Sequence, residues 1–139
     1  MLVIKLIGFI LIALLIYWIM IEINRYSYKQ YKYDFFNMQN FVSTAIGYIL
    51  LYFGNRWYAS ALKSGGDLLN GQIIIGIGTL FIFYVVYLNI KKTSFIFGLF
   101  FTGFQLLLYI GLSFIAFLVL VIGAAALSET KPVYVLNND

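Results

Sequence analysis

The chain has 139 residues, of which 63% are apolar and only 10% are charged, and its formal net charge is +4. A soluble domain carries about 25% charged residues, so this composition predicts one integral membrane domain rather than a water-soluble globule. The sequence contains no cysteine and no histidine, which excludes disulfides, thiolate nucleophiles and imidazole ligands for a metal or haem within this chain.

The first apolar run covers residues 3–23, and only Lys5 interrupts it before Glu22. Its length is that of a membrane-spanning helix, about 20 residues. A secretory signal peptide with Lys5 as its basic region is the alternative, but no small-x-small cleavage site follows the run. We therefore expect a retained first transmembrane helix.

A polar linker, residues 24–39, follows the first run. Arg25, Lys29 and Lys32 are spaced i, i+4, i+7 and would form one stripe if the first helix continued beyond the membrane. Such a stripe can bind anionic lipid headgroups, at about 1 kcal/mol per basic residue. The more frequent explanation is an ordinary collar of basic residues at a membrane border. Glu22 lies three residues before Arg25, which predicts an ion pair on the helix.

A second span is expected over residues 40–62. Its purely apolar part is short, so the helix would run through Arg56 to the aromatic pair that follows it. Arg56 can extend outward to the headgroups or face the bundle interior and bind an anion. We favour the first alternative, because an aromatic anchor lies beside it.

The turn between the second and third spans reads KSGGDLLN over residues 63–70, and Asp67 is suited to capping the helix that follows. The third span is predicted over residues 70–90. Gly76, Gly78 and Thr79 make one end of this helix slim, which permits close approach of another helix. Lys91 and Lys92 then mark a membrane border.

The fourth span, residues 95–127, contains no charged residue. A single helix over this run would be about 50 Å long, whereas the hydrocarbon core is about 30 Å thick. It must bend, protrude or cover its excess against other protein. Gly98 and Thr102 form a small-x-x-x-small pair, Gly103 and Gly111 lie two such steps apart, and Gln105 can hydrogen-bond across helices. Residues 128–139 form a short tail.

The predicted fold is therefore all-α: a four-transmembrane-helix bundle with an overlong or kinked fourth helix. With four spans, the linker side would hold five basic residues and the opposite side four. This small excess places the linker inside and both termini outside. We expect a multi-pass protein of a bacterial inner (plasma) membrane.

Several functions are disfavoured by the residues present. Ser43 and Thr44 lack a base, and no two carboxylates lie close in sequence, so we predict no enzyme activity. A proton-coupled carrier needs an ionisable residue inside the bundle, and none lies in the middle of a predicted span. No metal ligand set, cofactor motif or basic face for nucleic acid is present.

The remaining hypothesis is a small membrane subunit or interaction partner, in a homo-oligomer or with other membrane proteins. Small and polar residues would make the helix contacts: Gly76, Gly78, Thr79, Gly98, Thr102, Gln105 and Gly111. The alternative is a small oligomeric channel or pore for an ion or small solute. Its wall would include Thr79, Thr102, Gln105 and Ser113, with Arg56 attracting anions at one mouth.

Overall fold

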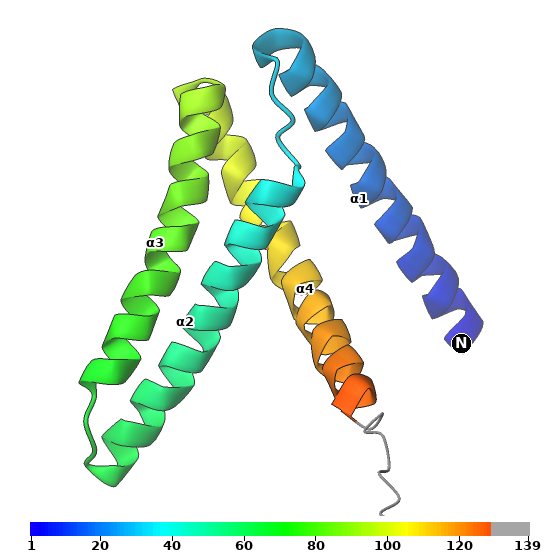
Figure 1. Ribbon diagram of the computed structural model, residues 1–139. Coiled ribbons are helices and arrows are strands. Elements are labelled where there is room, and N and C mark those ends of the chain that lie inside the picture. The colour runs from blue at the N-terminus through cyan, green and yellow to red at the C-terminus, as the bar shows by residue number, and fades with distance from the viewer. Residues whose placement is uncertain (129–139) are drawn as a thin grey trace, which may run out of the picture.

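The computed structural model describes residues 1–128, which form four α-helices and no strand (Figure 1). They are α1 (Leu2–Tyr31), α2 (Met38–Ser64), α3 (Leu69–Lys92) and α4 (Phe95–Ser128). The fold is thus all-helical, as predicted from composition. The predicted tail, except for Ser128, lies outside the described residues.

Three of these helices are long and apolar enough to cross a membrane: Val3–Tyr31 within α1, Leu69–Lys92 and Phe95–Ser128. A multi-pass helical membrane protein follows from them. The 27 residues of α2 are long enough for a crossing, but polar residues such as Asn40, Asn55 and Arg56 lower its hydropathy. A fourth crossing by α2 stays a prediction.

The first helix continues well past the expected end of its span. Residues 24–31, predicted as linker, are helical, and only residues 32–37 connect α1 to α2. No glycine or proline interrupts this polar stretch, so the helix has no breaker before Lys32. There the backbone turns left-handed, with φ 56°, and the Lys32 N–H donates to the Tyr28 carbonyl at 3.0 Å.

α2 and α3 form a close antiparallel pair through small residues that recur every seven positions. The residues of this series are all buried: Gly47, Gly54 and Ala61 on α2, and Gly71, Gly78 and, at the third position, the larger Val85 on α3. A Cβ added at Gly78 would lie 2.9 Å from the Gly47 carbonyl oxygen, so the two backbones are in direct contact. A seven-residue repeat keeps one seam facing the partner helix, as in left-handed membrane helix pairs.

α4 is one unbroken helix of 34 residues, about 50 Å long. Its buried residues lie in the first half and share one face: Gly98, Thr102, Gln105, Tyr109 and Ser113. From Phe114 to Ser128 no side chain is buried, and this half of α4 diverges from α2 and α3 (Figure 1). The overlong fourth helix therefore buries side chains only in its first half, although the Phe117 ring still contacts Phe53 of α2, with the ring centroids 5.8 Å apart.

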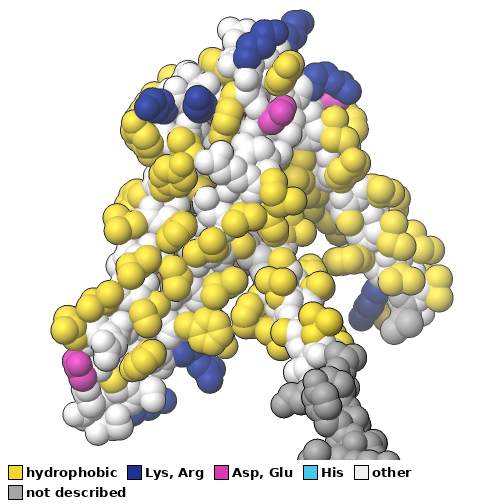
Figure 2. All heavy atoms as spheres, viewed as in Figure 1, with side chains coloured by type: hydrophobic (Ala, Val, Ile, Leu, Met, Phe, Trp, Pro, Cys, Tyr) yellow, Lys and Arg dark blue, Asp and Glu magenta, His cyan; other side chains and the backbone are white. Residues whose placement is uncertain are grey.

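α1 stands apart from the other three helices over most of its length (Figure 1). Of residues 3–31, only Ile23 and Ser27 are buried. Contact with α4 is made near the end of α1, where the Tyr26 and Phe97 rings stack with their centroids 5.4 Å apart. Hydrophobic side chains cover the length of all four helices on the face seen in Figure 2, as expected of a surface that faces lipid.

Candidate functional site

The connection between α1 and α2 folds inward against the first turns of α4. The Phe35 side chain is fully buried, at 0% exposure. Its ring packs edge-on against the Phe97 ring, with the ring centroids 5.7 Å apart. Asn24 of α1 clamps the connection, because its side chain accepts from the Phe36 N–H at 2.6 Å and donates to the Phe36 carbonyl at 3.0 Å. Phe35 and Phe36 of the connection thereby pack against the interior, whereas Lys32 and Asp34 are exposed.

One polar side chain from each of the three packed helices meets at this connection. Asn40 of α2 donates from Nδ2 to Asn89 Oδ1 of α3 at 2.8 Å. Asn89 Nδ2 donates to Gln105 Oε1 of α4 at 2.7 Å. Gln105 Nε2 and Asn40 Nδ2 both donate to the Phe35 carbonyl, at 2.8 and 3.0 Å. Exposure of these three amides is at most 1%.

Hydroxyl groups extend this amide network. Tyr33 donates to Asn89 Oδ1 at 3.0 Å and accepts from Asn40 Nδ2 at 2.9 Å. Thr102 accepts from Asn89 Nδ2 at 2.9 Å and donates to the Gly98 carbonyl of its own helix. A buried polar group without a partner is costly in an apolar interior, so these mutual hydrogen bonds determine how α2, α3 and α4 meet.

The chemistry available to the network is limited to hydrogen bonding. Its members are amides and hydroxyls, none of which carries a charge. Within residues 1–128, no group of three or more histidine, cysteine, aspartate or glutamate side chains is placed to hold a metal ion. The arrangement serves to join helices.

Four buried oxygen atoms have no hydrogen-bond partner among residues 1–128: Ser27 Oγ, Asn40 Oδ1, Thr44 Oγ1 and Ser113 Oγ. Asn40 and Thr44 lie one turn apart on α2. Ser113 is on the face of α4 that also carries Gln105 and Tyr109. Unfilled hydrogen-bonding capacity therefore remains inside the bundle beyond the network.

The residues predicted for helix packing or a pore wall are placed in two different environments. Gly78, Gly98, Thr102 and Gln105 are buried, and a Cβ added at Gly98 would lie 2.7 Å from Ile90 Cα. A Cβ at Gly76 or Gly111 would meet no atom within 4 Å.

Thr79 is half-buried and donates to the Ile75 carbonyl of its own helix at 2.9 Å. The other polar residues predicted for a pore wall, Thr102, Gln105 and Ser113, share one buried face of α4.

The predicted basic residues lie on the outer surface. Arg25 forms the expected pair with Glu22, with Nη1 2.6 Å from Oε1 and the Arg25 side chain 69% exposed. Lys29 is exposed, and Lys32 Nζ lies 5.4 Å from the Tyr28 ring centroid. Arg56 does not enter the bundle interior: it is exposed and lies 5.9 Å from the Tyr52 ring centroid.

Sequence reasoning did not single out the members of the network on α2 and α3, Asn40 and Asn89, nor Tyr33 of the connection. A signal was available, because asparagine is costly inside an apolar helix unless it is hydrogen-bonded. Gln105 was recognised on the same basis. Asn40 and Asn89 differ from Gln105 in that they lie close to the ends of their helices, where polar residues are common.

These features define a multi-pass helical membrane protein with a buried amide network at one end of its packed helices. No protein-family model, curated protein or solved structure matches the chain.

Proposed function

We propose that this protein is a membrane subunit that associates with copies of itself, or with another membrane protein, through α1 and the second half of α4. The observation that supports this proposal is the uneven packing of the helices. The helical turns near the network contain most of the buried polar residues of α2, α3 and α4. By contrast, residues 3–22 and 114–128 contain no buried side chain.

Helix association in a bilayer does not rest on hydrophobicity, because lipid tails are as apolar as leucine; it rests on close packing and hydrogen bonds. Within this chain, these interactions are concentrated in α2, α3 and the first half of α4. α4 is about 50 Å long and diverges from α2 and α3 after its first half. Its second half is therefore suited to contact a second protein. The long apolar faces of α1 and α4 are the proposed contact surfaces.

The pore alternative has less support from the geometry. Thr102 and Gln105 would have to face a path for ions, but both are at most 1% exposed and are hydrogen-bonded to neighbouring helices. The subunit proposal requires no such opening. A flux assay on liposomes that contain the purified protein separates the two, since a subunit of this kind moves no ion or small solute by itself.

The basic residues support a second contact, with lipid. The end of α1 and the end of α3 lie at the same end of the molecule (Figure 1). The basic residues there are Arg25, Lys29 and the cap residue Lys32 of α1, and Lys91 and Lys92 of α3. Each contributes about 1 kcal/mol to attraction by anionic headgroups. We infer that this end faces the cytoplasmic leaflet, in accord with the excess of basic residues there.

Cysteine cross-linking tests the subunit proposal directly, because the sequence has no cysteine. Single cysteines at Leu14 of α1 and Leu120 of α4 should cross-link in native membranes, giving a dimer or an adduct with another protein. Leu80→Cys is the matched control, since Leu80 is 68% exposed on α3. Absence of cross-links at both test positions, together with a monomer that copurifies with no protein, would contradict the proposal.

A further inference from the structure

Two buried side-chain oxygens of α2 lie one helical turn apart, and neither has a hydrogen-bond partner. They are Asn40 Oδ1 and Thr44 Oγ1, which form no hydrogen bond with any group of residues 1–128. Asn40 is 1% exposed and Thr44 is 0% exposed. On a helix, residues four apart have Cβ atoms about 5–6 Å from each other. Because unpaired oxygens are costly in an apolar interior, a ligand that bonds to both would stabilise the bundle.

The orientation of the Asn40 amide is fixed by its other partners. Asn40 Nδ2 donates to the Phe35 carbonyl at 3.0 Å and to Asn89 Oδ1 at 2.8 Å. Both of these groups are acceptors, so a flipped amide would place oxygen against oxygen. Asn40 Oδ1 therefore cannot join the amide network by rotating, and its free acceptor must be satisfied by another molecule.

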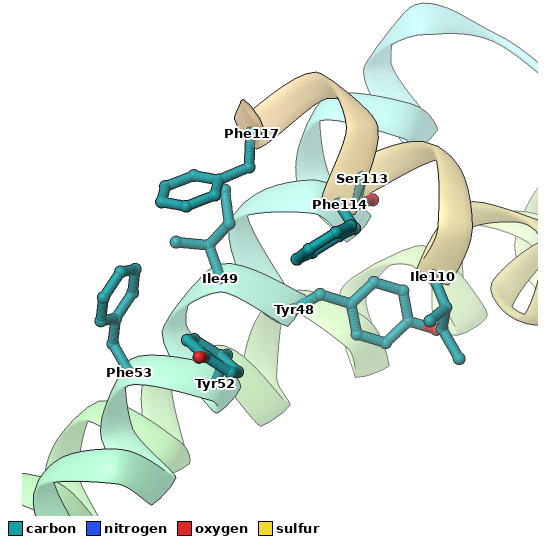
Figure 3. A pocket seen from close by; sticks show the side chains of 8 residues that line it. All are labelled: Tyr48, Ile49, Tyr52, Phe53, Ile110, Ser113, Phe114 and Phe117. Carbon is teal, nitrogen blue, oxygen red and sulfur yellow. The ribbon is translucent and has the colours of Figure 1, made fainter. Parts of the chain in front are cut away.

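A stretch of α4 lies beside the same turns of α2. The Phe41 and Tyr109 rings pack edge-on with their centroids 5.2 Å apart, and the Tyr48 hydroxyl donates to the Leu106 carbonyl at 2.8 Å. Figure 3 shows the Tyr48 ring directed from α2 toward α4. Thr44 lies one turn from Phe41 and one turn from Tyr48, so it is on the face of α2 that is turned to this stretch of α4.

The Tyr109 hydroxyl supplies a donor at this place. It accepts from Gln105 Nε2 at 3.4 Å, which leaves its own hydrogen to give to an acceptor. Tyr109 is 3% exposed. Together, the Asn40 oxygen, the Thr44 hydroxyl and the Tyr109 hydroxyl offer both acceptors and donors to one small ligand.

A water molecule suits these three groups better than an ion. Buried waters typically make about three hydrogen bonds to groups that are otherwise unpaired. A cation would meet only neutral oxygens, which do not offset the cost of removing its hydration shell. We propose that a water molecule is bound between α2 and α4, donating to Asn40 Oδ1 and Thr44 Oγ1 and accepting from Tyr109 Oη. It extends the amide network by one turn toward the middle of the bundle.

Replacement of the Thr44 hydroxyl by a methyl group tests this site by the sign of its effect. Thr44→Val should raise the equilibrium constant for unfolding in mild detergent about five- to fiftyfold, because the water loses a partner. A hydroxyl that binds nothing would give a neutral or more stable variant, since valine removes an unpaired polar group. Thr79→Val is the control: its hydroxyl donates to the Ile75 carbonyl of its own helix at 2.9 Å, and we expect a change of less than about twofold.

A double substitution tests whether α2 and α4 share one water. Tyr109→Phe should also destabilise the protein. Combined with Thr44→Val, it should have a smaller effect than the product of the two separate effects, by at least about twofold, because each change weakens the same site. Independent effects of the two substitutions would contradict a shared water.

The water contact is also observable in the unmodified protein. With ¹³C-labelled threonine methyl groups in nanodiscs, nuclear magnetisation should pass from water to the Thr44 methyl group. Thr102 is the control, because it is buried and its hydroxyl is bonded to Asn89 and to its own helix. Absence of transfer to Thr44, or transfer to both threonines alike, would overturn the proposal even if the variants fold poorly. Loss of stability when choline replaces Na⁺ and K⁺ would identify a cation at this place and would equally overturn it.

Discussion

At the scale of single residues, Asn89 connects the three packed helices. Its side chain accepts from Asn40 and Tyr33 and donates to Gln105 and Thr102. Removal of this amide would leave Gln105 Oε1 without a partner and would take one hydrogen bond each from Asn40, Tyr33 and Thr102. The cost of each unpaired group exceeds the net contribution of the hydrogen bond itself, because water cannot replace the lost partner.

Asn89→Ala should therefore lower the free energy of unfolding by about 1–3 kcal/mol, measured by thermal or denaturant unfolding in a mild detergent. The matched control is Asn55→Ala, an exposed asparagine of α2, which should change stability by less than about 0.5 kcal/mol. Equal effects of the two substitutions would show that the network does not hold the helices together.

At the scale of the helices, α2 and α3 are packed by backbone contact rather than by large side chains. Glycine in a helix normally costs about 0.5–1 kcal/mol relative to alanine. That cost is offset where the missing Cβ lets another helix approach, as at Gly78, whose added Cβ would lie 2.9 Å from the Gly47 carbonyl oxygen. At Gly76, two residues earlier, no such atom lies within 4 Å.

Gly78→Ala and Gly76→Ala should consequently change stability in opposite directions. The first forces two backbones apart and should destabilise the protein by about 1–3 kcal/mol. The second gains helix propensity without a clash and should be neutral or stabilise by up to about 1 kcal/mol. Unfolding of the two variants side by side in the same detergent checks the prediction, and a more stable Gly78→Ala variant would refute the close packing.

At the scale of the whole molecule, the arrangement has one packed, basic end, from which α1, α4 and the α2–α3 pair diverge (Figure 1). Whether α2 crosses the bilayer determines on which side the α2–α3 turn lies. If α2 crosses, this turn and the α1–α2 connection lie on opposite sides. From the excess of basic residues we then expect the connection in the cytoplasm.

Cysteine labelling of intact cells that express the protein decides this topology. A membrane-impermeant maleimide should label Ser64→Cys at the end of α2 without permeabilisation. It should label Gln30→Cys, at the end of α1, only after permeabilisation. Both native residues are exposed, so burial does not explain a difference. Identical behaviour of the two positions would mean that α2 does not cross.

The helical fold and the membrane location could be predicted from the sequence, because its low charge content and the length of its apolar runs indicate both. Gln105 could also be recognised from sequence, as an amide in the middle of an apolar run. The end of α1 was not predicted, because the span was taken to end with the apolar run at residue 23, whereas the polar residues that follow contain no helix breaker and continue the helix to Tyr31.

Which helix faces pack together became known from the three-dimensional structure. In water, a buried helix face is recognised because it is more apolar than the exposed one. In lipid, both faces are apolar, so hydrophobicity does not distinguish Gly78 from Gly76 or the packed half of α4 from the uncovered half. Asn40, Asn89 and Gln105 come together because each lacks water and needs a partner, and that requirement is met only once three helices and the Phe35 carbonyl share one place.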